Sequence, residues 1–217
     1  MTSRNVRTSA GPRAGVVALA VAGVFLLAGC SGGAPADPGT GSPSASESAS
    51  PSPSATPTPT PSAVYKPADA TGPAQNVPVP VLPEVAKTET KEGLEAFVRY
   101  WYQVLDYSYQ TGDSTILQKI SGPACVFCAG LGDGIAESWK DGRWISGGRV
   151  ETPVITGTLE PGKEPYAVVQ VIQAIIEIRN ADGSLHQAPT PATNTGSRAA
   201  VKFDGNSWIL TDLGLIR

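Results

Sequence analysis

Apolar residues recur at spacings of three and four in the stretch that begins near residue 90, which is the pattern of an amphipathic helix. The apolar face consists of Leu94, Phe97, Val98, Trp101, Val104 and Leu105. Thr88 or Thr90 can cap its N-terminus, because a threonine hydroxyl accepts a hydrogen bond from a free backbone N–H of the first turn. Thr111-Gly112-Asp113 combines a helix stop with a new N-cap, so the pattern predicts a helix that ends near Gln110.

Two shorter helices are predicted after this stop. The first covers Ser114–Ile120 and is ended by Gly122-Pro123, since neither residue is tolerated well inside a helix. The second runs from about Ala124 to about Lys140. The first half of the folded region is therefore expected to be helical.

Beyond residue 149 the pattern changes to β-branched runs separated by turn signals. Strands are predicted over residues 149–159, 166–179, 198–203 and 207–213. Asp204-Gly205-Asn206 indicates a hairpin between the last two, and residues 185–197 are expected to form a mobile loop. Helices followed by antiparallel strands predict an α+β fold, in which the long helix covers one face of a curved sheet of about four strands.

The start of the chain has a different pattern. Arg4, Arg7 and Arg13 precede an apolar segment over residues 14–28, with no acidic residue among them. Leu27-Ala28-Gly29-Cys30 then closes the segment and resembles a bacterial lipobox, whose cysteine is lipidated and becomes the mature N-terminus. The alternatives are an uncleaved membrane anchor, although fifteen residues are short for a span of about twenty, and ordinary secretion. The lipobox predicts a protein on the extracytoplasmic face of the cell membrane, which it contacts through lipid on Cys30.

Residues 31–83 contain mainly Pro, Ser, Thr, Ala and Gly, with almost no large apolar side chain. Such a composition buries too little apolar surface to offset the entropy of ordering, so a disordered, extended tether is expected. Ser and Thr beside Pro can also accept O-glycans. The predicted organisation is a signal peptide over residues 1–29, Cys30 and a tether over residues 30–83, and one globular α+β domain over residues 84–217.

Charge excludes nucleic acid as a partner. Removal of residues 1–29 leaves 13 of the 16 basic side chains against 19 acidic ones, a formal charge of −6. Nucleic-acid binding needs a basic stripe that neutralises phosphates. The longest basic grouping is Lys140, Arg143 and Arg149, and Asp141 interrupts it.

Cys125 and Cys128 are the one motif with intrinsic reactivity. With Cys30 lipidated, they form an even pair in an oxidising compartment, which predicts a structural disulfide. The alternative is a thiol oxidoreductase, because a helix N-terminus stabilises a thiolate. The single histidine, His186, lies in the predicted loop and is expected to be solvent-exposed. One histidine leaves no metal site and no cofactor to expect, and no Ser-His-Asp or Cys-His arrangement.

Tyrosines surround Trp101 on the predicted long helix, with one carboxylate among them. Tyr100, Trp101, Asp106 and Tyr107 form a candidate pocket, in which a tyrosine beside a carboxylate could hydrogen-bond a carbonyl ligand or act as an acid–base pair. The alternative is ordinary packing, because Tyr100 and Tyr107 repeat at seven residues and Trp101 belongs to the apolar face.

The element order of a long aromatic helix, two short helices and a curved sheet resembles the cone-shaped fold of the nuclear-transport-factor-2-like group. That resemblance implies a pocket between helix and sheet. The lipobox, the tether and the segments Phe97-Val-Arg-Tyr-Trp101, Thr111-Gly-Asp113 and Cys125-Val-Phe-Cys128 resemble an uncharacterised family of actinobacterial lipoproteins. We therefore expect a non-enzymatic envelope protein that binds a protein or a small ligand. The alternative is an envelope thiol oxidoreductase or an isomerase-like enzyme.

Overall fold

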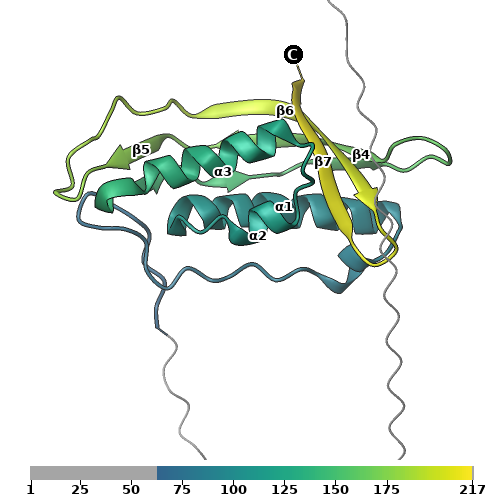
Figure 1. Ribbon diagram of the computed structural model, residues 1–217, viewed down its shortest axis with the longest axis horizontal. Coiled ribbons are helices and arrows are strands. Elements are labelled where there is room, and N and C mark those ends of the chain that lie inside the picture. Colours follow the sequence, from purple (N-terminus) through teal and green to yellow (C-terminus); the bar gives the residue numbers. More distant parts are fainter. Residues whose placement is uncertain (1–62, 217) are drawn as a thin grey trace, which may run out of the picture. The chain divides into compact units, whose positions relative to one another are not determined.

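Helix α1 (Lys91–Thr111) is the longest element and runs along an antiparallel sheet (Figure 1). The computed structural model describes residues 63–216, so the predicted signal peptide, Cys30 and residues 31–62 of the predicted tether lie outside the described residues. Thr90 caps α1, and its Oγ1 accepts from the Gly93 N–H at 3.0 Å. Gly112 ends it in the left-handed conformation at φ 75°, which glycine adopts without steric cost. The predicted helix of about residues 90–110 is confirmed.

The two shorter helices are present near their predicted positions. They are α2 (Thr115–Lys119) and α3 (Val126–Ser138). Single 3-10 turns lie before α1 (η1, Glu84–Lys87) and after α3 (η2, Lys140–Gly142). The helices precede the strands in the chain, as the sequence predicts.

Five strands form the main sheet, in the order β2-β4-β6-β7 with β3 also paired to β4, and every pairing is antiparallel. Their bounds are β2 (Val150–Glu151), β3 (Ile155–Thr158), β4 (Tyr166–Gln173), β6 (Thr193–Phe203) and β7 (Trp208–Ile216). β1 (Trp144–Gly147) and β5 (Ile176–Arg179) form a separate two-stranded sheet. The α+β class, with three N-terminal helices packed against an antiparallel sheet of four to five strands, is confirmed.

Four details of the strand prediction are wrong. The predicted strand 149–159 is divided into β2 and β3. β1 was not predicted, and the predicted strand 166–179 is divided into β4 and β5, which belong to different sheets. The predicted loop 185–197 is shorter, because β6 begins at Thr193 and its residues 193–200 pair with β4. Leu185 and Thr190 also form bridges to β5. Pairing with neighbouring strands overrides the loop-like local composition here.

The folded unit begins earlier than the sequence predicted. Residues 63–83, assigned to the tether from composition, lie against the unit and run along α1 (blue in Figure 1). The Tyr65 hydroxyl donates to Gln110 Oε1 at 2.7 Å, and the Trp144 indole N–H donates to the Asp69 carbonyl at 3.0 Å. Leu82 packs against the core. We call residues 63–83 the strap; tertiary hydrogen bonds order it where its composition alone would not.

The core lies between α1 and the sheet. Its largest fully buried side chains are Trp101, Trp208, Phe97, Leu94, Leu117 and Ile135. The indole N–H groups within the core find polar partners, since Trp101 donates to Ser121 Oγ at 2.9 Å and Trp208 to the Thr88 carbonyl at 3.0 Å. Among residues 63–216, no helix combines the length and the apolar character that a membrane crossing requires.

Candidate functional site

The four predicted pocket residues do not lie together. Trp101 is completely buried in the core and Tyr100 is 7% exposed, so both serve packing. Asp106 and Tyr107 face a surface groove instead. The prediction of one pocket containing all four is therefore wrong. Asp106 and Tyr107 line the groove, Trp101 projects from another side of α1, and Tyr100 packs in the core although it lies one heptad from Tyr107.

The groove that Asp106 and Tyr107 line has a volume of about 700 Å³ and is open to solvent. Three segments form its walls: one side of α1, the strap, and the chain around β2. The lining residues are Tyr65, Val77, Pro78, Val79, Pro80, Arg99, Tyr102, Gln103, Asp106, Tyr107, Gln110, Arg149, Val150, Glu151, Thr152 and Pro153. We call this site the groove.

Asp106 is engaged on both of its carboxylate oxygens. Oδ1 accepts from the Val150 N–H at 2.9 Å, and Oδ2 accepts from Gln110 Nε2 at 2.8 Å and lies 3.3 Å from an Arg149 nitrogen. Burial raises the pKa of this carboxyl above its ordinary value, although the Val150 N–H and the Arg149 charge oppose the shift. A carboxylate with both oxygens engaged holds Val150, Gln110 and Arg149 in place.

A second cavity, of about 240 Å³, lies between α1, α3 and the sheet, where the cone resemblance implied one. Its walls are Tyr102, Leu105, Tyr109, Phe127, Leu131, Val150, Val171, Gln173, Thr193, Thr195, Ser197, Leu213, Gly214 and Leu215. We call this cavity the pocket. Within residues 63–216, no charged side chain lines the pocket, and its polar groups are hydroxyls and one amide.

Two tyrosines give the pocket its polar character. The Tyr102 hydroxyl and Ser197 Oγ are hydrogen-bonded at 2.6 Å, and burial raises the pKa of Tyr102 to about 12. Burial likewise raises the pKa of Tyr109, while a contact with Gln173 opposes the rise. Both phenols therefore stay protonated near neutral pH, so the pocket offers neutral hydrogen-bonding groups in apolar surroundings.

The predicted disulfide is present. Cys125 and Cys128 are joined, with the sulfurs 1.99 Å and the Cα atoms 5.3 Å apart. Both residues are buried, at 1% and 4% exposure, and Cys125 caps α3 by accepting from the Cys128 N–H. Phe127, between them, is 44% exposed and lies at the edge of the pocket. The bond fixes the start of α3 beside the pocket, and its buried sulfurs are poorly placed for thiol exchange.

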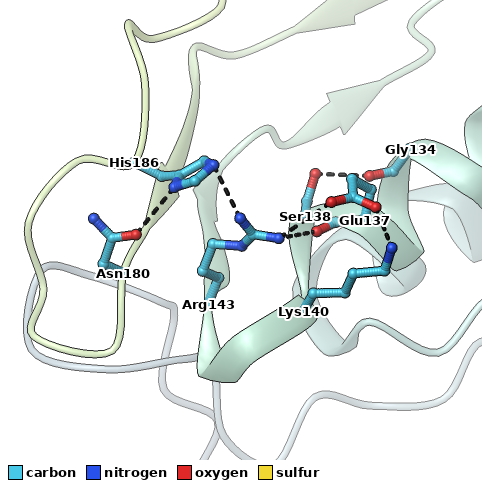
Figure 2. Close-up of polar contacts among 7 residues, drawn as sticks. All are labelled: Gly134, Glu137, Ser138, Lys140, Arg143, Asn180 and His186. Atoms are coloured by element: carbon cyan, nitrogen blue, oxygen red, sulfur yellow. Dashed lines mark hydrogen bonds and ion pairs between the residues drawn. The ribbon is translucent and has the colours of Figure 1, made fainter.

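His186 is exposed, as predicted, and belongs to a polar cluster shown in Figure 2. Arg143 lies at its centre, 2.9 Å from His186 Nε2 through one nitrogen and donating to the Glu137 carbonyl at 2.7 Å through another. His186 Nδ1 is 3.1 Å from Asn180 Oδ1. The cluster connects the end of α3 to the loop after β5, which is a structural role. Among residues 63–216 no group of His, Cys, Asp and Glu could hold a metal ion.

Sequence reasoning missed most of the residues that line the pocket. Leu105 already belongs to the predicted apolar face, and Tyr102 and Tyr109 lie three residues before it and four after it, so an extension of that face would have placed them toward the sheet. Ser197 and Thr195 carried no such signal, because they were assigned to a loop. They face the pocket only because β6 pairs with β4, with Ser197 opposite Val169.

Comparisons with known proteins show the family of this chain. No curated protein matches the sequence. Several solved structures match, among them the crystal structure of the intermembrane space region of the chloroplast protein ARC6. That match has 12% identity and a TM-score of 0.42, and it covers 59% of this chain and 98% of the other. Residues 63–214, from the strap almost to the end of β7, match the family described as a family of unknown function, DUF6318. The chain belongs to this family.

Proposed function

We propose that this protein is a lipid-anchored protein of the cell envelope whose folded unit binds a small neutral ligand in the pocket without transforming it chemically. The observation that carries the proposal is the composition of the pocket. Apolar side chains from α1, α3 and the sheet surround a few hydroxyl groups, and no charged side chain of the described part of the chain lines the pocket. Apolar walls with a few convergent polar groups are typical of small-molecule sites.

The walls define the chemical class of the ligand. A charged ligand would lose its hydration without gaining a counter-ion, which is costly. An apolar ligand with one hydroxyl or carbonyl group would bury its body and hydrogen-bond to Tyr102, Ser197 or Thr195. The volume of about 240 Å³ is below the roughly 300–1,000 Å³ of sites for drug-sized molecules. The ligand is therefore small, or it inserts one end.

The protonated state of the Tyr102 phenol favours a binding role for the pocket over a catalytic one. A general acid or base works best when its pKa lies near the operating pH. The pKa of Tyr102 is about 12, and Asp106 has both oxygens engaged outside the pocket. An isomerase-like mechanism that pairs a tyrosine with Asp106 finds no support in this arrangement, and neither does a redox role for the buried Cys125–Cys128 pair.

The proposal includes two assignments. The folded unit belongs to the nuclear-transport-factor-2-like group, and the chain is an actinobacterial lipoprotein. The order of helices and strands and the pocket between α1 and the sheet support the first point. The lipobox Leu27–Cys30 supports the second.

Lipid attachment is tested by metabolic labelling of expressing cells with an alkyne fatty acid. The wild-type chain is expected to carry the label in the membrane fraction, and the Cys30→Ala variant is expected to carry none. A label of equal intensity on the variant would contradict anchoring through Cys30.

Ligand binding is tested with the neutral fluorescent probe N-phenyl-1-naphthylamine, which brightens in apolar sites. 1-Octanol should displace it about tenfold or more effectively than octanoate, because a buried unpaired carboxylate costs more than the roughly 1.4 kcal/mol of a tenfold change. Val171→Phe, which fills the pocket from β4, should abolish probe binding. Arg99→Gln, on the groove, is the matched control and should bind normally. Equal displacement by octanoate, or normal binding by a folded Val171→Phe variant, would contradict the proposal.

A further inference from the structure

The groove is built differently from the pocket, although both contact Tyr102. Its walls are one side of α1, the strap residues Val77–Pro80, and residues 149–153. Its volume of about 700 Å³ lies within the roughly 300–1,000 Å³ of ligand sites. Charged side chains line it on two walls, and prolines and tyrosines supply the apolar surface between them.

Two arginines are held at the groove by contacts that leave most of their donors free. Arg99, on α1, donates through Nη1 to the Thr152 carbonyl at 2.9 Å. Arg149 lies 3.3 Å from Asp106 Oδ2 through its Nη1. A guanidinium carries five N–H donors, and within residues 63–216 each of these two uses a single nitrogen in a polar contact with the protein. Held arginines lose less entropy on binding a carboxylate, which a guanidinium recognises with paired hydrogen bonds.

The strap presents a backbone without internal partners along this wall. Among the described residues, the N–H groups of Val77 and Val79 and the carbonyls of residues 77–80 form no hydrogen bond. Pro78 and Pro80 have no N–H, so donors recur at every second residue. An extended chain with free donors and acceptors can pair with the main chain of another extended segment.

The charges around the groove balance. Arg99 and Arg149 are opposed by Asp106 and Glu151, and Glu151 is exposed and forms no ion pair with the described residues. A polyanion such as a nucleic acid or a polyphosphate requires a positive surface, which this is not. A peptide matches the groove better, because it combines a carboxylate with N–H and carbonyl groups and, in many sequences, a cationic group for Glu151.

We propose that the groove binds a short extended peptide whose carboxylate is held by Arg99 and Arg149 and whose main chain pairs with the strap at Val77–Pro80. This site is separate from the pocket and takes a different chemical class of ligand. Tyr65, Tyr107 and Pro153 form the apolar surface against which its side chains pack.

The test uses the full-length chain, purified in detergent and immobilised through a C-terminal tag. It is incubated with a synthetic pool of tetrapeptides that carry free C-terminal carboxylates and neutral side chains, and separately with the same pool amidated at the C-terminus. Mass spectrometry measures the peptides retained. The free-carboxylate pool should be retained about tenfold more strongly, as expected for a charge-assisted hydrogen-bond pair. Equal retention of the amidated pool would overturn the proposal.

Three variants locate the site. Arg99→Gln and Arg149→Gln should each lower retention of the free-carboxylate pool about tenfold. Arg198→Gln is the matched control, because Arg198 is an exposed arginine of β6 that stacks on Tyr166 and lines neither cavity. All three should bind N-phenyl-1-naphthylamine as the wild type does, which shows that they are folded. Retention by the two groove variants that equals the control would overturn the assignment.

The strap is tested through the main chain of the peptide. The most strongly retained tetrapeptide is resynthesised with N-methyl groups at alternate residues, which removes backbone donors and leaves the carboxylate. Its retention should fall to the level of the amidated pool. Unchanged retention would show that the strap does not pair with the peptide, and would overturn that part of the proposal.

Discussion

The pocket and the groove lie on two sides of the same helix and differ in the charge of the side chains that line them. The pocket is less open than the groove, and its polar groups are neutral: hydroxyls, among them those of Tyr102, Tyr109 and Ser197, and one amide. The groove is open, and its polar groups include two arginines and two carboxylates. Charged groups stay in water or in pairs because their burial is costly, so we expect the pocket to prefer neutral ligands and the groove to tolerate charged ones.

The helical repeat places the α1 residues of the pocket and those of the groove on different sides of the helix. Tyr102, Leu105 and Tyr109 recur every three or four residues and face the sheet, whereas Arg99, Gln103 and Tyr107 recur every four residues along the groove. Tyr102 lines both sites. Substitutions on one side of α1 should therefore change one site and leave the other intact, and substitutions that displace Tyr102 should affect both.

The largest effect is expected from Trp101→Ala, which should disturb the pocket and the groove together. Trp101 is completely buried and contacts the ring of Tyr102 edge-on, with centroids 5.1 Å apart. Truncation of a buried aromatic residue to alanine costs about 3–5 kcal/mol. Urea denaturation should show this loss, and both the probe and the peptides should bind less. Loss of one ligand alone would show that the two sites do not share a core.

Tyr102→Phe tests the hydrogen bond between Tyr102 and Ser197 in the pocket. The substitution leaves Ser197 Oγ buried without its 2.6 Å partner, which costs about 1–3 kcal/mol. The double variant Tyr102→Phe/Ser197→Ala removes both partners and should recover most of that stability. A thermodynamic cycle of the wild type, both single variants and the double variant measures the coupling. Strictly additive single effects would contradict a hydrogen bond between these hydroxyls.

The disulfide should matter to the pocket and not to the groove. Cys125 and Cys128 close a loop of four residues, for which the chain-entropy relation gives at most about 2 kcal/mol of stabilisation. The Cys125→Ala/Cys128→Ala variant loosens the start of α3, where Phe127 lines the pocket. Probe affinity should fall while retention of the carboxylate peptides stays unchanged. A fall in peptide retention of the same size would contradict the separation of the two sites.

The fold was predictable where local pattern and tertiary structure agree. Thr90 and Gly112 marked the ends of α1 in the sequence because capping depends on local residue type. β1 was not predictable, since its four residues form a strand only by pairing with β5, more than 25 residues later. The strap was missed for the same reason: its order depends on Gln110 and Trp144, which composition cannot reveal.

The candidate site was predictable only in its residue types. Tyrosines and an aspartate on the long helix have side chains suited to a site, but neighbours in sequence need not be neighbours in space. Asp106 and Tyr107 lie at the edge of α1, whereas Trp101 lies in the core. Helical periodicity would have separated them. The β6 residues that line the pocket could not be predicted from the sequence, because strand register decides which of them face it.

The smallest effect is expected from Asp106→Asn, which acts on the groove alone and carries a distinct pH signature. Burial raises the pKa of Asp106 above 3.8, so the folded state holds this proton more tightly than the unfolded state. The free energy of unfolding that Asp106 contributes must then fall as pH rises from 3.8 through the folded pKa. Asp113 and Glu137 have lowered pKa values and give the opposite slope, but wild type and variant share them. The difference between the two proteins, measured by urea denaturation across this pH range, isolates Asp106.

At pH 7 the difference in the free energy of unfolding between wild type and Asp106→Asn should lie within about 1 kcal/mol, because Arg149, the ionic partner, is more than half exposed. Peptide retention should fall, since Arg149 loses the carboxylate that positions it, and probe binding should not change. A wild type that gains stability over the variant as pH rises would show that the pKa of Asp106 is lowered, and that its contacts in the groove outweigh its burial.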